Sequence, residues 1–384
     1  MKKTVYRFSF ATGVVIAGIL IILIFTFLGD KSKGPLSEFL SKIQSKVIDI
    51  ESSYLLSQRK PVRSADLGWF NKYRVDKELL SSPDTILWGI YDNHYQESFE
   101  NVIRLEDNLN IDNALIQLYI AWGDKPEQEF PMKYVKAINS LGSTPFITWE
   151  PWLNDFDRKK HGLSIKEDQN KNGLLDVING DYDFYIEKWA LDVKEFGKTV
   201  FIRLGHEMND PYRYPWGPQN NKPQEFVDAW KHVVDRFNGL GATNVVWVWS
   251  PHQAYMMYEY YYPGDDYVDW VGVGALNYGT VAVWSKWWSF SEIFGDYYYW
   301  LQMYNKPLII TEFGSLAVGG EKDQWFFDAL NKLPQKYPLL KAVMLYNNDN
   351  DNTTLNKTLD WSLNSDTLTW KAIHKAVDNW VIDK

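Results

Sequence analysis

Residues 200–210 read VFIRLGHEMND, and residues 308–315 read LIITEFGS. Each stretch opens with an almost continuous apolar run rich in β-branched residues. A short segment with polar residues, one of which is a glutamate, follows this run. A short apolar run without polar alternation is typical of a parallel strand that is buried on both faces. The two stretches therefore predict buried strands whose ends carry polar side chains.

The same pattern of apolar run, polar loop and helical stretch recurs along the chain. We expect strands at residues 85–91, 114–121, 145–149, 200–204, 244–249, 270–275, 308–311 and 342–346. Helices are expected at residues 130–141, 182–196, 223–238, 290–303, 322–333 and 366–379. Eight strand–helix units predict an α/β protein with a (β/α)8 TIM barrel. An open doubly wound sheet is the alternative, but its glycine-rich phosphate loop is not found after the first strand.

Catalytic groups in such a barrel lie at the carboxyl ends of the strands. The fourth and seventh strands, which face one another across the mouth, end close to Glu207 and Glu312. Two opposed carboxyls, about 5–5.5 Å apart in retaining enzymes, are what glycoside hydrolysis needs. Arg203 can hold one carboxylate ionised, and His206 can help to orient Glu207. Each glutamate taken alone could equally be a solvated loop carboxylate.

Longer motifs around these residues resemble glycoside hydrolase family 26. The strand-four motif is HEMN at 206–209 with YPWG at 214–217, and the strand-seven motif is TEFG at 311–314. WEPW at 149–152 and DW at 360–361 fit the same family, and the resemblance covers roughly residues 84–380. It implies a (β/α)8 barrel and double displacement with retention, Glu207 being the acid/base and Glu312 the nucleophile. It also implies β-mannan as the usual substrate, with mixed-linkage β-glucan or β-1,3-xylan for some members.

The resemblance implies further contacts. Tyr278 matches a tyrosine that hydrogen-bonds the nucleophile. Trp216 and Trp361 match sugar platforms, and the alternative for both is core or rim packing. Trp149, Trp152 and the intervening Glu150 would line the glycone side, unless Glu150 faces solvent. The ends of strands one and eight, GIYD at 89–92 and LYNND at 345–349, depart from the runs of many mannanases.

The N-terminus predicts a membrane anchor. Residues 8–28 form an almost unbroken apolar run of 21 residues, enough to span a hydrocarbon core of about 30 Å. Basic residues precede this run, so we expect the remainder of the chain to be extracytoplasmic. A cleaved signal peptide is the alternative, although its apolar region is usually about 7–15 residues long. The expected domains are an anchor (1–30), a helical juxtamembrane stalk (31–60) and a catalytic barrel (61–384).

Residues 36–54 of the stalk repeat apolar side chains at helical spacing. This seam either packs on the barrel of its own chain or pairs with a second copy, which would give self-association.

Other classes of site are disfavoured. The net charge of −9 and the lack of a basic run argue against a nucleic-acid partner, and the lack of cysteine excludes thiolate chemistry. A zinc protease helix would need a second histidine where Asp210 stands. No Gly-x-Ser-x-Gly elbow occurs. We expect no cofactor, and β-linked polysaccharide is the expected partner.

Residues 168–176 resemble the first nine positions of a calcium-binding loop. Oxygen-bearing side chains fall at positions one, three, five and nine, which are Asp168, Asn170, Asn172 and Asp176. The twelfth position is Asn179 rather than the bidentate glutamate, and the segment also fits a polar surface turn. Calcium bound here would be structural.

Two alternatives remain open at this point. A barrel of another functional class could bind glycan at the surface without turning it over. A hydrolase of the same family could instead process an exopolysaccharide that the cell itself makes.

Overall fold

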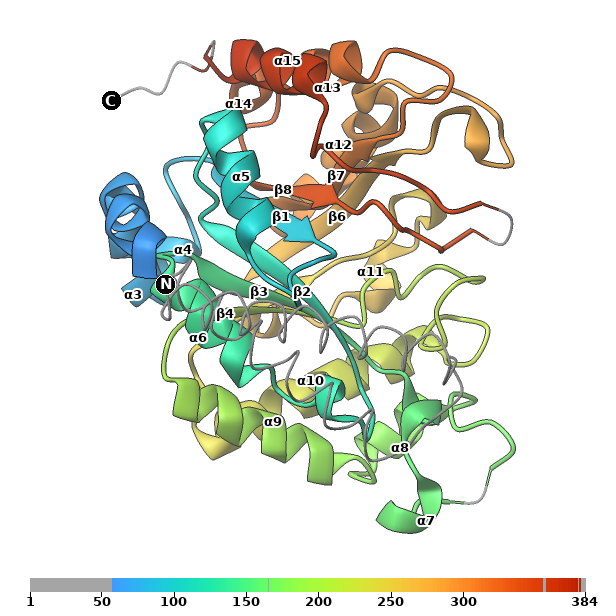
Figure 1. The fold of residues 1–384 in the computed structure, drawn as a ribbon. Coiled ribbons are helices and arrows are strands. Elements are labelled where there is room, and N and C mark those ends of the chain that lie inside the picture. The colour runs from blue at the N-terminus through green and yellow to red at the C-terminus, as the bar shows by residue number, and fades with distance from the viewer. Residues whose placement is uncertain (1–56, 165, 355–356, 379, 381–384) are drawn as a thin grey trace, which may run out of the picture. The chain divides into compact units, whose positions relative to one another are not determined.

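Eight parallel strands close into a barrel in sequence order (Figure 1). The computed structural model describes residues 57–164, 166–354, 357–378 and 380, and these residues belong to one compact unit. The predicted (β/α)8 barrel is confirmed. The strands are β1 (Leu87–Asp92), β2 (Leu115–Ala121), β3 (Thr144–Glu150), β4 (Val200–Leu204), β5 (Val245–Trp249), β6 (Trp270–Asn277), β7 (Leu308–Ser315) and β8 (Leu340–Asn347).

Helices follow the strands and surround the barrel (Figure 1). The longer ones each bury one apolar face, as an amphipathic helix on a sheet should. They are α5 (Glu100–Leu109), α6 (Met132–Ser140), α9 (Asp183–Phe196), α10 (Pro223–Leu240), α13 (Lys322–Leu330) and α15 (Thr367–Val377). Shorter helices lie in the loops: α7 (Arg158–His161), α8 (Gly173–Ile178), α11 (Tyr258–Tyr261), α12 (Asp296–Leu301) and α14 (Leu333–Lys336).

Two predicted helices are broken. The helix expected over residues 290–303 consists of a π-helical turn, Ser291–Gly295, followed by α12. The helix expected over residues 322–333 ends at Leu330, and α14 begins three residues later. Pro334 explains this second break, because a proline ring clashes with the carbonyl four residues earlier, which here belongs to Leu330.

Side chains alternate between the barrel interior and the helical layer, as the two-residue period of a strand requires. On β4, Phe201 belongs to the inner cluster, whereas Val200 and Ile202 belong to the outer one. The inner cluster continues into Phe70 and Leu80 from the segment that precedes β1. The Trp270 indole N–H donates to the Leu80 carbonyl at 2.9 Å, so this segment closes the N-terminal end of the barrel.

The predicted anchor and most of the predicted stalk lie outside the described residues. Within the described part of the chain, no helix is both long enough and apolar enough to span a bilayer. Residues 57–66 are helical and contact α5. Arg59 pairs with Asp107, and the buried Arg63 bonds Glu106 with 2.6 Å between Nη2 and Oε1. The last residues of the predicted stalk therefore pack on their own barrel.

Candidate active site

Glu207 and Glu312 line one pocket at the open end of the barrel. Its volume is about 410 Å³, and its walls include Arg213, His252 and Tyr278. Gly274 on β6 lies beside both carboxyls. A Cβ added to Gly274 would lie 3.8 Å from Glu207 Oε1 and 4.0 Å from Glu312 Oε2. One oxygen of each carboxyl therefore borders the same space next to Gly274.

Glu312 is held by two donors on the same oxygen. Tyr119 donates its hydroxyl to Oε1 at 2.7 Å, and Arg203 Nη2 donates to Oε1 at 2.8 Å. Burial alone would raise the pKa of Glu312, but the Arg203 charge and these two hydrogen bonds outweigh it and lower the pKa. Glu312 is therefore an ionised carboxylate whose other oxygen, Oε2, faces the gap beside Gly274.

Arg203 is buried beneath Glu312 with every nitrogen bonded. Its Nε donates to Thr148 Oγ1 at 3.0 Å, and its Nη1 donates to Thr311 Oγ1 at 2.7 Å. Its Nη2 donates to the Tyr119 hydroxyl at 3.0 Å as well as to Glu312. The rigid fork of donors on a guanidinium suits such a multiple contact, so Arg203 is fixed under Glu312.

A bulge in β7 lets two consecutive residues face inward. Thr311 and Glu312 both bond Arg203, which ordinary strand alternation would not allow. The pairing of β7 shifts at this point: Val273 pairs with Ile310, but Gly274 pairs with Glu312. The extra residue turns the Glu312 side chain into the barrel, in keeping with the occurrence of bulges beside active sites.

Glu207 occupies a strained and buried position. Its φ is +54°, uncommon for a non-glycine residue, and its backbone N–H donates to the Ser250 carbonyl at 2.7 Å. The residue is only 7% exposed, and Oε2 accepts no hydrogen bond from the described residues. Burial raises the pKa of Glu207 against the opposing effects of His252 and Arg213. The pocket thus favours a protonated Glu207.

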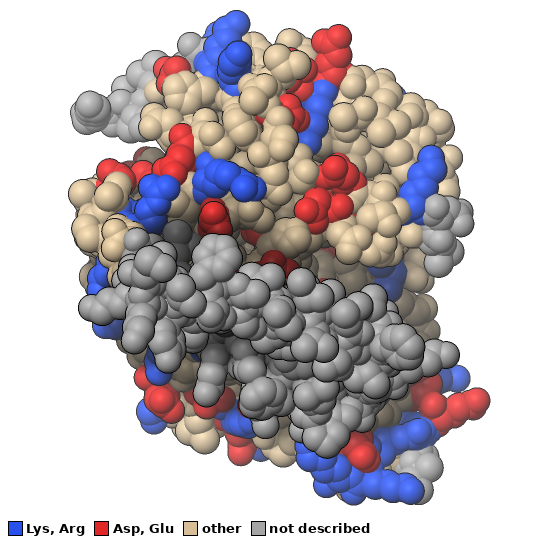
Figure 2. Space-filling model, viewed as in Figure 1, with Lys and Arg blue, Asp and Glu red and all other residues tan. Residues whose placement is uncertain are grey.

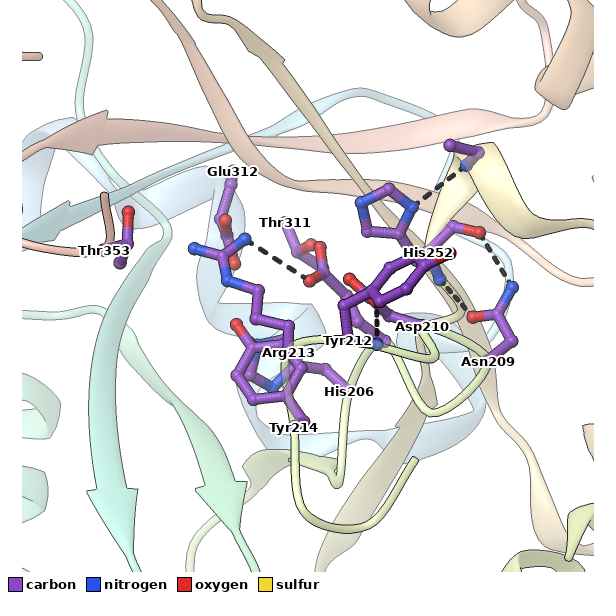
Figure 3. A network of polar contacts seen from close by, with 12 residues as sticks. His206, Asn209, Asp210, Tyr212, Arg213, Tyr214, His252, Thr311, Glu312 and Thr353 are labelled. Atoms are coloured by element: carbon purple, nitrogen blue, oxygen red, sulfur yellow. Dashed lines mark hydrogen bonds and ion pairs between the residues drawn. The ribbon is translucent and has the colours of Figure 1, made fainter. Parts of the chain in front are cut away.

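Arg213 lies at the pocket wall, and Figure 3 shows it near Glu312. Its Nη1 is 3.7 Å from Glu207 Oε2, and its guanidinium lies 5.4 Å from the centre of the Tyr214 ring. Its charge opposes the burial effect on the pKa of Glu207 and helps to lower the pKa of Glu312.

His206 does not orient Glu207 directly. Its Nε2 pairs with the Tyr214 hydroxyl at 3.0 Å, while Nδ1 lies 4.0 Å from Glu150 Oε1 and has no hydrogen-bond partner among the described residues. Burial and the nearby Arg203 charge lower the pKa of His206 well below its ordinary value, so the ring is neutral. The predicted contact is thus replaced by one to Tyr214.

Glu150 faces the site rather than bulk solvent. Burial raises its pKa to about 7, opposed by the hydrogen bond that Trp152 Nε1 donates to Oε2 at 3.1 Å. The half-buried Trp152 also packs edge-on against Trp216, with ring centres 5.6 Å apart. Glu150 and Trp152 therefore lie close to His206, and their contact with the glycone side stays a prediction.

Tyr278 needs correction. It lines the pocket, but among the described residues the tyrosine that bonds Glu312 is Tyr119, not Tyr278. The Tyr278 ring packs edge-on against Trp361, with ring centres 4.9 Å apart, and faces Trp284 at 6.3 Å. It is a wall of the pocket in this structure.

Three predicted sugar-contacting tryptophans are also corrected, because each is buried. Trp149 is 0% exposed and stacks on Trp189 of α9 at 4.4 Å, on the outer face of β3. Trp216 stacks on Tyr214 at 4.7 Å and donates its indole N–H to the His206 carbonyl. Trp361 donates its indole N–H to Asp351 at 2.8 Å. None of the three offers a free ring face to a sugar, so they act as packing residues next to the site.

The calcium-like loop shows protein contacts for two of its oxygen residues. Asp168 Oδ1 accepts from Asn154 Nδ2 and from the Asn170 backbone, each at 2.9 Å. Asp176 pairs with Lys166, and Asn172 takes a left-handed conformation (φ +51°) before α8. These contacts are those of a polar turn, and calcium binding here stays a prediction.

Sequence reasoning missed Tyr119, which bonds Glu312, and the pocket residues Arg213, His252 and Trp284. Tyr119 could have been found, because it lies two residues after Gln117 and four after Leu115 on the inward face of β2. The other three lie in loops, where no periodic pattern gives their direction.

Charges of both signs are interspersed over the face shown in Figure 2. Basic side chains gather over α7, whose residues include Arg158, Lys159 and Lys160. Among the described residues on this face, no continuous basic stripe of the kind that tracks a nucleic-acid backbone is seen.

A (β/α)8 barrel whose mouth holds two carboxyls, one with a raised and one with a lowered pKa, has the arrangement used by glycoside hydrolases. The chain belongs to glycosyl hydrolase family 26, whose family model matches residues 133–369. The predicted family resemblance is therefore confirmed.

Individual relatives agree with this placement. Endoglucanase H of Acetivibrio thermocellus is 32% identical over 272 residues, which cover 68% of this chain but 27% of that protein. A mannan endo-1,4-beta-mannosidase of Bacillus subtilis is 25% identical over 329 residues, covering 79% of this chain and 82% of that protein. A solved family 26 β-mannanase from Bacteroides ovatus has a TM-score of 0.55 at 17% identity, covering 79% of this chain and 93% of that chain. At this identity the structural likeness shows the fold.

Proposed function

We propose that the protein is a retaining endo-β-glycan hydrolase that works by double displacement. The observation that carries the proposal is that two carboxyls at one gap have pKa values shifted in opposite directions. Arg203 and Tyr119 lower the pKa of Glu312, whereas burial raises the pKa of Glu207. An acid and a nucleophile on opposite sides of a glycosidic bond are the two groups that retention requires.

Each carboxyl has one oxygen toward the gap, which assigns the steps. Glu207 gives its proton to the glycosidic oxygen as the bond from that oxygen to the anomeric carbon breaks. Glu312 Oε2 attacks the anomeric carbon and forms a glycosyl-enzyme ester, while Oε1 keeps its bonds to Arg203 and Tyr119. Glu207, now ionised, takes a proton from water as the water oxygen attacks the same carbon and releases Glu312.

We propose β-mannan as the substrate class, with β-glucan as the second candidate. The sequence similarity to a mannan endo-1,4-beta-mannosidase supports mannan. The 32% identity to endoglucanase H supports glucan, as do the strand ends at residues 89–92 and 345–349 that depart from many mannanases. Manno- and gluco-configured chains differ at C2, where contacts to the hydroxyl strengthen in the transition state, so the catalytic rate should discriminate between them.

The test is product analysis on mannan, mixed-linkage glucan, β-1,3-xylan and cellulose, using wild-type protein, Glu312→Ala and the matched control Glu321→Ala. Glu321 is an exposed carboxylate that does not line the pocket. We expect the wild type and the control to release oligosaccharides from one of these polymers, and Glu312→Ala to lose activity by at least about 1,000-fold. A wild type that binds glycan but cleaves none would favour the non-catalytic alternative. Near-normal turnover by Glu312→Ala would refute the mechanism.

We also propose that residues 8–28 anchor the enzyme in the membrane with the barrel outside the cytoplasm. The support is the length and composition of this apolar run and the basic residues before it. Protease added to intact cells should degrade the barrel while the protein still fractionates with membranes. A barrel protected until the cells are broken, or recovered free in the medium, would contradict the anchor.

A further inference from the structure

His252 is bonded to the loop after β4, which carries Glu207. Its backbone N–H donates to Asn209 Oδ1 at 2.7 Å, and Asn209 Nδ2 donates back to the His252 carbonyl at 2.9 Å. Just upstream of His252, the Ser250 carbonyl accepts the backbone N–H of Glu207. The loops after β4 and β5 are thus joined on both sides of Glu207 and His252.

The His252 ring has a defined tautomer. The Ala254 backbone N–H donates to Nδ1 at 3.0 Å, so Nδ1 is an acceptor and the ring proton belongs on Nε2. The Tyr255 ring packs on one side, with ring centres 4.7 Å apart. Figure 3 shows the edge of the ring away from this backbone contact turned toward the interior of the site, on the side of Asp210.

Two carboxyls lie beside this ring. One oxygen of Glu207, one of Asp210 and one ring nitrogen of His252 all lie within 4.8 Å of one another. Because Nδ1 is already occupied, the nitrogen left for the carboxyls is Nε2. Asp210 Oδ1 accepts the Tyr212 backbone N–H at 2.8 Å, which holds this second carboxyl in place.

We infer that His252 is a positioning residue for the acid/base carboxyl: its Nε2–H lies beside Glu207 and Asp210 and favours the ionised form of Glu207. The inference rests on the proposed function, since it explains how a buried acid can release its proton at each turnover. Burial works against that release, and an N–H dipole of His252 within 4.8 Å of a Glu207 oxygen opposes the effect of burial. The ring thereby keeps the acid within reach of neutral pH.

The same three side chains form a donor set that zinc can accept. Zinc on Nε2 would require the ring proton on Nδ1, where it would face the Ala254 N–H instead of accepting it. The geometry therefore favours a hydrogen-bond donor over a metal ligand. Activity unchanged by EDTA is expected, and activity lost to EDTA and restored by zinc would overturn the inference.

Other charged or titratable groups also face this position from neighbouring elements. They are Arg213, Tyr212 and His206 from β4 and its loop, Tyr255 from the same loop as His252, and Glu312 from β7. A variant of His252 leaves all of them in place. Because the bonds to Asn209 use only the His252 backbone, a side-chain variant should also keep the loop.

The test compares His252→Ala and His252→Gln with wild type through the pH profile of kcat/KM on unactivated polysaccharide, whose alkaline limb reports loss of the Glu207 proton. Removing the N–H should destabilise ionised Glu207 and move the alkaline limb of His252→Ala upward by about half a pH unit or more. His252→Gln retains an N–H donor and should restore much of the wild-type limb. An unmoved limb in His252→Ala, or equal shifts in both variants, would overturn the inference.

A direct titration separates this inference from the proposed function. Protein with 13C-labelled glutamate carboxyls gives the pKa of Glu207 by NMR, assigned by difference from Glu207→Gln, whether or not any polymer is cleaved. We expect a higher Glu207 pKa in His252→Ala than in wild type. An unchanged pKa would refute the role of His252, whereas a changed pKa in a protein that hydrolyses nothing would refute only the proposed activity.

Discussion

Tyr119 on β2 donates its hydroxyl to Glu312 on β7 at 2.7 Å, across the interior of the barrel. Arg203 donates to both the Tyr119 oxygen and the same Glu312 oxygen, so three strands fix one carboxylate. With Oε1 doubly bonded, Oε2 is left free and faces the gap beside Gly274. This pairing defines the orientation of the proposed nucleophile.

Replacing Tyr119 with Phe should move the acidic limb of the pH–rate profile. Glu312 must be ionised to attack, and its pKa is lowered in part by the Tyr119 hydroxyl. Without that donor the pKa rises, so activity should disappear at a higher pH on acidification, by about one pH unit, while the alkaline limb stays. Profiles of kcat/KM for the two proteins make the comparison. An acidic limb at its wild-type position would contradict the assigned contact.

Replacing Arg203 with Met should destabilise the fold as well as abolish activity. It leaves the Glu312 charge buried without its guanidinium and strips two threonine hydroxyls of their donor, at a cost of about 3 kcal/mol in the free energy of unfolding. The double variant Arg203→Met with Glu312→Gln should recover part of that loss, because the uncompensated charge is gone. Urea unfolding of all four proteins measures the coupling. Strictly additive losses would indicate that the pair is not coupled.

Adding a methyl group at Gly274 should abolish most of the activity but leave the fold intact. A Cβ there meets Glu207 and Glu312 oxygens at ordinary contact distances, yet it occupies the gap where the anomeric centre should react. Gly274→Ala should lower kcat/KM by about 100-fold or more, in line with small misplacements at reacting centres. Gly239→Ala, at an exposed position of α10 where a Cβ meets nothing within 4 Å, is the control and should remain fully active. Full activity of Gly274→Ala would move the reaction site elsewhere.

Trp149 and Trp284 should behave in opposite ways. Trp149→Ala removes a fully buried ring between β3 and α9 and should cost about 3–5 kcal/mol of stability. Trp284 is 55% exposed at the pocket wall, so Trp284→Ala should raise KM several-fold with an unchanged melting temperature. Thermal unfolding and steady-state kinetics check both. A large rise in KM for Trp149→Ala without destabilisation would restore it as a sugar contact.

Side chains along a strand alternate between the inward and outward face, and this alternation decides which side-chain directions the sequence could predict. Phe201 and Arg203 share the inward face of β4, as Leu115 and Tyr119 do on β2, so the direction of Arg203 was predictable and that of Tyr119 could have been. The same counting sends Trp149 outward, because Glu150 is the inward residue at the end of β3. The family motif favoured Trp149 over this simpler geometric argument.

The same alternation would have given the wrong direction for Glu312. Counting from Ile309 in the inner cluster makes Thr311 inward and Glu312 outward, and only the bulge reverses this. A bulge arises from the pairing with both neighbouring strands, which a single strand's sequence does not contain. The loop residues Arg213 and His252 escaped for a related reason, since their directions depend on contacts between loops.

Trapping the covalent intermediate tests the central claim most directly. An activated 2-deoxy-2-fluoro β-glycoside of the cleaved sugar should inactivate the enzyme in step with formation of one glycosyl adduct. Peptide mass spectrometry should place the adduct on Glu312, and Glu312→Gln should stay unlabelled. An adduct on another residue, or hydrolysis with inverted configuration and no adduct, would contradict the account.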